Sequence, residues 1–174
     1  IYNMDNLELL KQMESELVDL IYCDILYNTG KKFKDFVDKL GTPQEAIEWY
    51  RPRLIEMNRV LKETGSIYLQ CDYRLVHYLK VEMDSIFGLN NFRNDIIWQY
   101  SWGIRTEKCW NKKHDNILMY SKSPNIIFNA NDVLEERNLQ EQSRKRLKYK
   151  GALITDGNTR KSELALPSDV WNLP

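Results

Sequence analysis

A short apolar run that ends in a polar loop most constrains what this chain can fold into. Residues Leu20 to Asp24 are mostly β-prone, and the run stops at Asn28-Thr29-Gly30. A strand that is apolar on both faces and only a few residues long is typical of a parallel sheet covered by helices. In such sheets, ligands bind outside the carboxyl ends of the strands. Asp24 and Tyr27 therefore stand where chemistry is expected, although an ordinary polar turn fits the position as well.

Strand and helix patterns alternate along the next hundred residues. We expect a helix at residues 5–13, the strand at 20–24, a helix that begins with a capping box at 42–45 and stops at Gly65, a strand at 65–72, a helix at 73–87 that Gly88 ends, and strands at 94–100 and 114–121. The last strand should run back against the others. This rhythm predicts an α/β sheet with right-handed parallel crossovers. A charged surface helix is expected at 132–149, because that stretch is acidic first and basic later, which suits the helix dipole.

Composition bounds the class of protein. The 174 residues are enough for one domain with a sizeable core, and the formal net charge is zero. The middle is nonetheless basic, with 11 Lys and Arg against 6 Asp and Glu in residues 103–150, which points to a polyanion or to a solvated helix face. The three cysteines are widely spaced, so we expect neither a metal site nor a disulfide. No run reaches the length of a membrane span and no signal peptide is visible, so a cytoplasmic protein is expected.

The loop itself resembles a known family. Asp24-Ile25-Leu26-Tyr27-Asn28-Thr29-Gly30 is similar to the Asp-Pro-Pro-Tyr-Asn-Thr-Gly loop of DNA amino-methyltransferases, the DNA methylase N-4/N-6 family. These enzymes transfer a methyl group from S-adenosylmethionine to adenine N6 or cytosine N4. Ile25 and Leu26 stand where the family has two prolines, and proline would fix the backbone of this loop.

The resemblance covers nearly the whole chain, in the order of the permuted (beta) group, whose catalytic loop comes first. The segments that carry it are 3–10, 65–72, 87–98, 113–122 and 169–174. They imply a doubly wound, mostly parallel sheet of Rossmann-like methyltransferase type, with a small irregular target-recognition segment. Residues 1–128 would form the catalytic half and residues 129–174 part of a target-recognition region. The family's cofactor glycine loop lies beyond that region and has no counterpart here, so we expect a truncated chain.

The resemblance also assigns roles to residues. In the family the first loop residue and the next carbonyl accept hydrogen bonds from the target amino group, and the tyrosine stacks on the flipped-out base. The residues so implicated in catalysis are Asp24, Ile25, Leu26 and Tyr27. Those implicated in cofactor binding are Asp5, Cys23 and Asp24, although Asp5 is a helix N-cap on its residue type alone.

Basic residues near the loop and in the middle of the chain are the candidates for DNA contact. They are Lys31, Lys32, Arg105, Lys108, Lys112, Lys113 and His114. Lys31 and Lys32 precede aromatic residues that are suited to stacking on bases, but the same stretch fits a simple lid. His114 fits a general base less well than a structural role at a strand edge.

The resemblance therefore implies a DNA adenine-N6 methyltransferase of a restriction–modification system; adenine is preferred over cytosine because the surrounding match is to adenine-modifying members. The cofactor would be S-adenosylmethionine, and the partners would be double-stranded DNA and a homodimer mate or a restriction subunit. The alternative is an inactive remnant of such an enzyme that only binds DNA or a partner.

Overall fold

The computed structural model describes residues 1–101, 106–136 and 164–172. The chain divides into two compact units. Unit 1 contains residues 1–127 and 169–174, and unit 2 contains residues 128–168. Every element that positions the candidate site belongs to unit 1.

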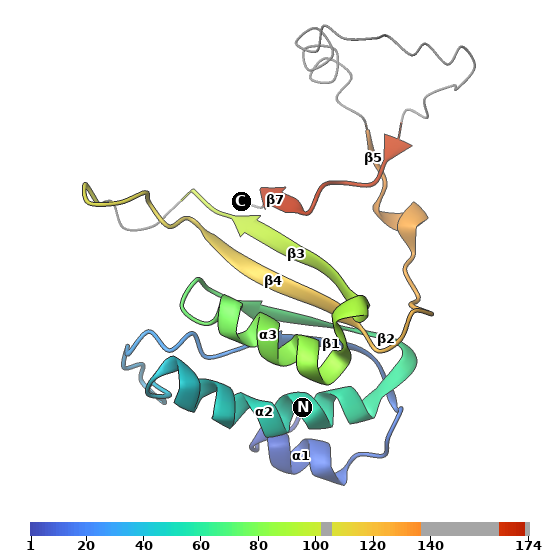
Figure 1. Ribbon diagram of the computed structural model, residues 1–174, viewed down its shortest axis with the longest axis horizontal. Coiled ribbons are helices and arrows are strands. Elements are labelled where there is room, and N and C mark those ends of the chain that lie inside the picture. Colours follow the sequence, from blue (N-terminus) through green and yellow to red (C-terminus); the bar gives the residue numbers. More distant parts are fainter. Residues whose placement is uncertain (102–105, 137–163, 173–174) are drawn as a thin grey trace, which may run out of the picture. The chain divides into compact units, whose positions relative to one another are not determined.

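Five strands of unit 1, all within the described residues, form one sheet (Figure 1). Their order is β1 (Val18–Asp24), β2 (Leu61–Cys71), β4 (His114–Ser121), β3 (Phe92–Gln99) and β7 (Val170–Asn172). The pairs β1–β2 and β3–β7 are parallel, whereas β4 is antiparallel to both of its neighbours. All strands except β4 therefore run in one direction. This confirms the expected α/β class, the mostly parallel sheet and the reversed strand at 114–121.

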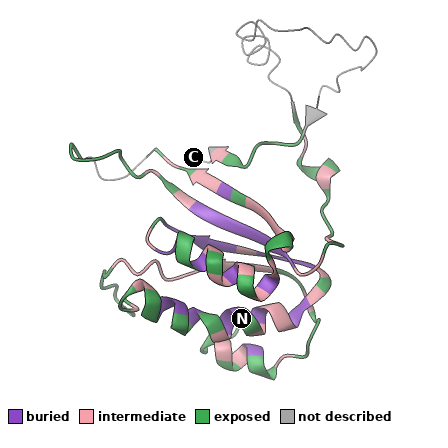
Figure 2. Ribbon diagram, in the orientation of Figure 1, coloured by how far each residue is buried: buried purple, intermediate pink, exposed green. Residues whose placement is uncertain are grey.

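Three helices of the described chain pack on one face of this sheet. They are α1 (Asn6–Gln12), α2 (Pro43–Val60) and α3 (Val76–Phe87), and a short 3₁₀ turn, η1 (Leu89–Asn91), follows α3. Alternate residues of a strand face the same side, and Ile67, Leu69 and Cys71 of β2 lie in the core cluster with Leu54, Leu79 and Tyr120. Figure 2 shows the buried residues on the inner sides of α2 and α3 and along β4. The opposite face carries a smaller cluster around Ile96, Ile117 and Met119.

Local sequence signals explain where α2 begins. The Thr42 side chain accepts a hydrogen bond from the Glu45 N–H, and the Glu45 carboxylate accepts one from the Thr42 N–H. This reciprocal capping box, with proline at the first helical position, is worth about 1 kcal/mol.

The end of α2 differs from the expectation. The helix stops at Val60 rather than at Gly65, because residues 61–64 already belong to β2. Gly65 instead lies inside the strand, where an added Cβ would meet the Asp19 carbonyl oxygen and the Leu61 side chain at 2.9 Å. The glycine is needed for a close approach between strands and not as a helix stop.

The helix after β2 starts later than the sequence suggests. Helix α3 begins at Val76 and not at Tyr73. The Asp72 carboxylate accepts a hydrogen bond from the Arg74 N–H at 2.9 Å, while its carbonyl accepts from Leu75 and Val76. Asp72 therefore stabilises the turn that leads into the helix. Gly88, with φ of +89°, ends α3 as expected.

Unit 2 contains a 3₁₀ turn, η2 (Ala130–Val133), and two paired two-residue strands, β5 (Glu135–Glu136) and β6 (Leu164–Ala165). The helix expected from residue 132 is thus wrong at its start, and residues 137–149 lie outside the described part of the chain. None of the described helices is long and apolar enough to span a lipid bilayer.

Candidate active site

The carboxyl ends of β1, β2 and β3 meet the start of β4 at one edge of the sheet. Asp24, the last residue of β1, pairs with Gln70 of β2, and Gln99 at the end of β3 pairs with His114 at the start of β4. Ligands bind at this kind of edge in α/β sheets. The topology thus brings chemistry-bearing residues from distant parts of the sequence together around Asp24.

The loop after Asp24 is held by side chains from other elements. Asp24 is exposed, whereas Ile25, Leu26 and Tyr27 are half-buried. Ile25 packs against the main core cluster. The Tyr50 hydroxyl, from the buried face of α2, donates to the Leu26 carbonyl oxygen at 3.0 Å. Packing and this hydrogen bond therefore constrain the two positions at which the resembling family has prolines.

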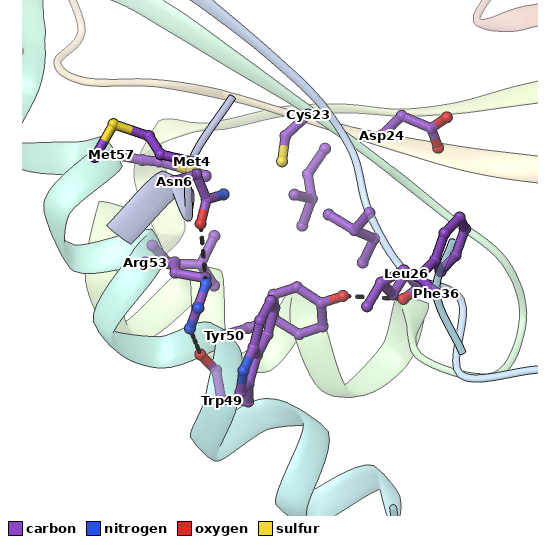
Figure 3. Close-up of a pocket in the computed structure, with 13 residues that line it drawn as sticks. Met4, Asn6, Cys23, Asp24, Leu26, Phe36, Trp49, Tyr50, Arg53 and Met57 are labelled. Atoms are coloured by element: carbon purple, nitrogen blue, oxygen red, sulfur yellow. Dashed lines mark hydrogen bonds between the residues drawn. The ribbon is translucent and has the colours of Figure 1, made fainter. Parts of the chain in front are cut away.

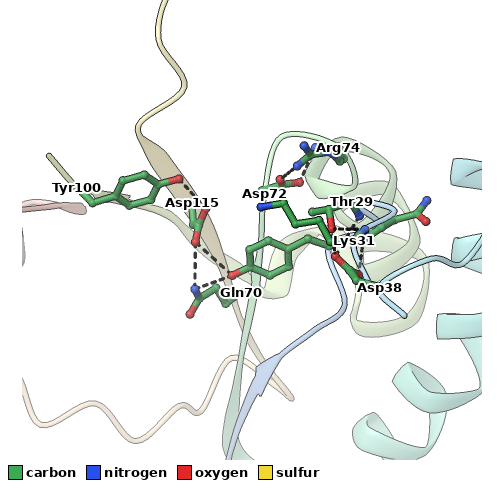
Figure 4. A network of polar contacts seen from close by, with 10 residues as sticks. Thr29, Lys31, Asp38, Gln70, Asp72, Arg74, Tyr100 and Asp115 are labelled. Atoms are coloured by element: carbon green, nitrogen blue, oxygen red, sulfur yellow. Dashed lines mark hydrogen bonds and ion pairs between the residues drawn. The ribbon is translucent and has the colours of Figure 1, made fainter. Parts of the chain in front are cut away.

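The Tyr27 hydroxyl belongs to a polar network on the sheet, and its partners Gln70 and Asp115 are labelled in Figure 4. It donates to a carboxylate oxygen of Asp115 at 3.2 Å and accepts from the Gln70 amide at 2.7 Å. The Tyr100 hydroxyl donates to the other Asp115 oxygen at 3.3 Å, and the Tyr22 hydroxyl donates to Gln70. Burial raises the pKa of Tyr27 well above its ordinary value, and the Asp115 and Asp24 charges add to this shift. The hydroxyl therefore stays protonated and keeps its donor role near neutral pH.

A cavity of about 410 Å³ opens beside Asp24 (Figure 3). Its lining combines the β1 end and the following loop with side chains from α2 and from the segment around the start of α1. The lining residues are Met4, Asn6, Cys23, Asp24, Ile25, Leu26, Phe36, Trp49, Tyr50, Arg53, Leu54, Met57 and Leu69. The volume and the mostly apolar wall with a few polar groups are typical of a small-molecule or cofactor site.

Arg53 organises one wall of this cavity. Its guanidinium is buried and lies 3.4 Å from the centre of the Trp49 ring. It donates to Asp5 at 2.7 Å and to the Asn6 side-chain oxygen at 3.0 Å. Asp5 also caps α1, because its other oxygen accepts from the Leu7 N–H at 2.8 Å. The expected N-cap is therefore present. The hydrogen bond from Arg53 lowers the pKa of the Asp5 carboxyl, which is therefore charged at neutral pH.

Cys23 lies in the cavity wall as a neutral thiol. Burial raises its pKa to about 11, and the neighbouring Asp24 charge contributes. A thiol with such a pKa is a poor nucleophile at neutral pH. Cys71 is buried in the core and Cys109 is exposed, and all three cysteines are free.

Lys31 and Lys32 lie on an exposed hairpin that follows the loop. The bridge between Lys32 and Val37 closes it, and the rings of Phe33 and Phe36 stack at its tip with centroids 4.7 Å apart. Both rings are about half exposed, and Phe36 reaches the cavity wall. The hairpin thus presents two lysines and two aromatic rings next to the candidate site.

The basic residues of the middle segment are placed in different ways. Lys112 lies over the Tyr73 ring at 3.7 Å, and Lys113 donates to the Ser101 carbonyl oxygen at 2.7 Å. Lys108 and His114 are exposed. Arg105 lies outside the described residues.

Several residues of the site carried no sequence signal that singled them out. Gln70 and Asp115 are the centre of the Tyr27 network, yet 43 and 88 residues separate them from Tyr27. Asp38 binds the loop backbone, and Arg53 lies in a helix whose pattern indicates only burial. The position of Gln70 next to a strand end was the one available hint.

Comparisons with known proteins point to one protein family. A profile of the DNA methylase family matches residues 18–174. The DNA adenine methyltransferase YhdJ of Escherichia coli K12 is 29% identical over 176 residues, which cover 100% of this chain and 57% of YhdJ. The type II methyltransferase M.HpaI of Haemophilus parainfluenzae is 32% identical over 125 residues, 71% of this chain and 39% of that protein. The chain thus spans about half the length of these curated relatives, or less.

A solved structure shares the fold. The Thermus thermophilus protein TTHA0409, described as a DNA modification methylase, superimposes with a TM-score of 0.53 at 18% identity. The match covers 74% of this chain and 55% of that protein, and it supports the Rossmann-like methyltransferase architecture of the sheet. The profile match over most of the sequence shows the family: this chain belongs to the DNA methylase (N-6/N-4) family.

Proposed function

We propose that this chain carries the catalytic loop and part of the cofactor pocket of a DNA methyltransferase that modifies adenine N6. The observation that carries the proposal is the position of Asp24. It ends a parallel strand, borders a cavity of cofactor size and precedes an aromatic ring that is fixed by its own network.

The cavity fits S-adenosylmethionine, which supplies an electrophilic methyl group when bound. Apolar and aromatic side chains such as Met57 and Trp49 suit an adenosyl group. The Asn6 side chain adds a polar partner. The Asp24 carboxylate would favour a positively charged ligand at the border of the cavity. We assign Asp5 a supporting role in this pocket, because it holds Arg53 and the start of α1 in place.

The loop would bind the target base outside the helix stack. An enzyme that modifies an exocyclic amino group must extrude the base to reach it. The Asp24 carboxylate and the Ile25 carbonyl would accept hydrogen bonds from the amino group, which orients the nitrogen lone pair for attack. The Tyr27 ring would stack on the base, and Leu26 would keep the loop in place through its carbonyl contact with Tyr50.

The exposed lysines suit the phosphates of double-stranded DNA. We assign such contacts to Lys31, Lys32, Lys108 and Lys112, with Lys113, His114 and Arg105 nearby in sequence. Residues 129–174 are proposed to contribute to target recognition; much of that range falls in the separate compact unit 128–168. On the sequence resemblance alone, we also propose a cytoplasmic restriction–modification role, with a second copy or a restriction subunit as partner.

The choice of adenine over cytosine rests on the sequence resemblance and on the activity named for YhdJ. The test is to incubate the natural gene product that contains this chain with labelled S-adenosylmethionine and assorted duplexes, and to identify the modified base after digestion. N6-methyladenine is expected. N4-methylcytosine would overturn the choice of base. DNA binding without any incorporation would favour a remnant that only binds DNA.

A further inference from the structure

The loop that follows Asp24 depends on one buried carboxylate. Asp38 lies at the end of the hairpin and is only 5% exposed. Its Oδ1 accepts the Asn28 N–H at 2.9 Å, and its Oδ2 accepts the Thr29 N–H at 3.0 Å and the Thr29 hydroxyl. Figure 4 shows Asp38 directed at this turn of the loop. A single side chain therefore satisfies two consecutive backbone donors next to Tyr27.

The backbone around Asp38 closes the same turn. The Gly30 N–H donates to the Asp38 carbonyl oxygen at 2.7 Å, and the Asp38 N–H donates to the Lys31 carbonyl oxygen at 2.8 Å. Asn28 has a φ of +57°, in the left-handed region that asparagine tolerates better than most residues. Its side chain bonds to the backbone of Leu40 and Gly41. The turn is thus fixed from both sides.

The chemistry of this contact requires a carboxylate. Among the described residues no lysine, arginine or histidine forms an ion pair with Asp38. The donors that bind its two carboxylate oxygens are the N–H groups of Asn28 and Thr29 and the Thr29 hydroxyl. An asparagine has the same shape, but either orientation of its amide would place an NH₂ group against a backbone N–H of Asn28 or Thr29. The substitution Asp38→Asn therefore removes the carboxylate while it keeps the volume of the side chain.

We propose that Asp38 is a positioning residue that holds the catalytic loop in the shape needed to receive the target base. The inference rests on the proposed methyl transfer. Asp38 touches no reacting group; it acts through the backbone of Asn28 and Thr29, next to Tyr27. In a loop without the proline pair, these hydrogen bonds replace part of the rigidity that proline would provide.

The kinetic test compares Asp38→Asn with the wild type in the natural gene product. A misplaced loop should lower kcat for methyl transfer by about tenfold to a hundredfold. The affinity for S-adenosylmethionine should stay close to that of the wild type, because Asp38 does not line the cavity. Asp35→Asn is the matched control, since Asp35 lies on the same hairpin but is exposed. It should leave kcat unchanged.

A second readout does not depend on activity. Amide hydrogen exchange of this chain should show faster exchange at Asn28 and Thr29 in Asp38→Asn, with unchanged exchange in β2 and β4. If Asp38→Asn does not fold, Thr29→Val removes the hydroxyl donor alone and should cause a smaller change of the same kind.

The outcomes separate this inference from the proposed function. Unchanged exchange at Asn28 and Thr29, or a wild-type kcat per folded molecule in Asp38→Asn, would overturn the positioning role. A wild-type protein that methylates no DNA would instead overturn the proposed function, while the exchange data would still decide whether Asp38 holds the loop.

Discussion

At the scale of single residues, the Tyr27 side chain has two separate roles, one for its ring and one for its hydroxyl. Its ring is proposed to stack on a base, and its hydroxyl is bound by Asp115 and Gln70. The sequence made Asp24 and Tyr27 candidates because strand ends in α/β sheets hold ligands. It could not locate Asp115 as the partner of Tyr27 or Asp38 as the partner of Asn28 and Thr29, because those contacts depend on strand register and on a long loop. Such contacts have no local signature.

Substitutions of Tyr27 should separate the contribution of the ring to DNA binding from the contribution of the hydroxyl to stability. Stacking on an aromatic side chain is worth about 1–3 kcal/mol per base, so Tyr27→Ala should weaken productive DNA binding by about tenfold to a hundredfold. Tyr27→Phe keeps the ring and should retain most of the methyl-transfer rate, while the lost hydrogen bonds lower stability by about 1 kcal/mol. Single-turnover rates and melting temperatures measure the two effects. A stable Tyr27→Ala protein with the wild-type rate would exclude the stacking role.

Four buried or half-buried tyrosines predict a loss of stability at alkaline pH. Burial raises the pKa of Tyr100 to about 12 and also raises those of Tyr27, Tyr50 and Tyr120, whereas an unfolded tyrosine titrates near 10. Above pH 10 the unfolded chain therefore loses protons that the folded chain keeps, and the free energy of unfolding should fall as pH rises. The slope is at most about 1.4 kcal/mol per pH unit for each such group.

Denaturant melts between neutral pH and pH 11 measure this slope. Tyr120→Phe should make the decline less steep, because the Tyr120 hydroxyl is buried against Asp84 at 2.7 Å. Tyr78→Phe serves as the control, since Tyr78 is half exposed on α3. Equal slopes in the wild type and in Tyr120→Phe would show that this burial does not control the alkaline transition.

At the scale of elements, local signals were reliable where they come from backbone chemistry. The cap of α1, the capping box of α2 and the glycine end of α3 appear as expected. The predicted boundary between α2 and β2 was wrong, because a glycine such as Gly65 can have two physical roles that look alike in sequence. It can end a helix, or it can allow a close strand approach, and only the tertiary contact with Asp19 distinguishes them.

The exposed hairpin gives a prediction about salt. If Lys31 and Lys32 contact phosphates, duplex affinity should fall with salt, and removing each charge should flatten the log–log slope by about one unit. The double variant Lys31→Ala/Lys32→Ala should therefore change the slope by about two units. Lys62→Ala is the control, because Lys62 pairs with Asp19 near the start of β1, at the other end of the strand from Asp24. A slope in the hairpin variant equal to that of the wild type would identify its lysines as solvated surface.

At the scale of the whole chain, the order of strands and motifs was more informative than composition. The neutral net charge indicated nothing about function, whereas the run of segments from residue 3 to residue 174 predicted the family that the profile then matched. The directions of the strands, including the reversed β4, followed from the alternation of elements along the chain. What the sequence could not provide was the side-chain network that links β1, β2 and β4 across the sheet edge.

The central claim is that Asp24 holds the amino group of the target base. Single-turnover methyl transfer by the natural gene product, wild type against Asp24→Ala, tests it most directly, with S-adenosylmethionine and duplex binding measured in parallel. Loss of the carboxylate should lower the transfer rate by about a hundredfold or more, further than any Tyr27 variant, while the protein stays folded and still binds DNA. A folded Asp24→Ala protein that transfers methyl groups at the wild-type rate would contradict the account.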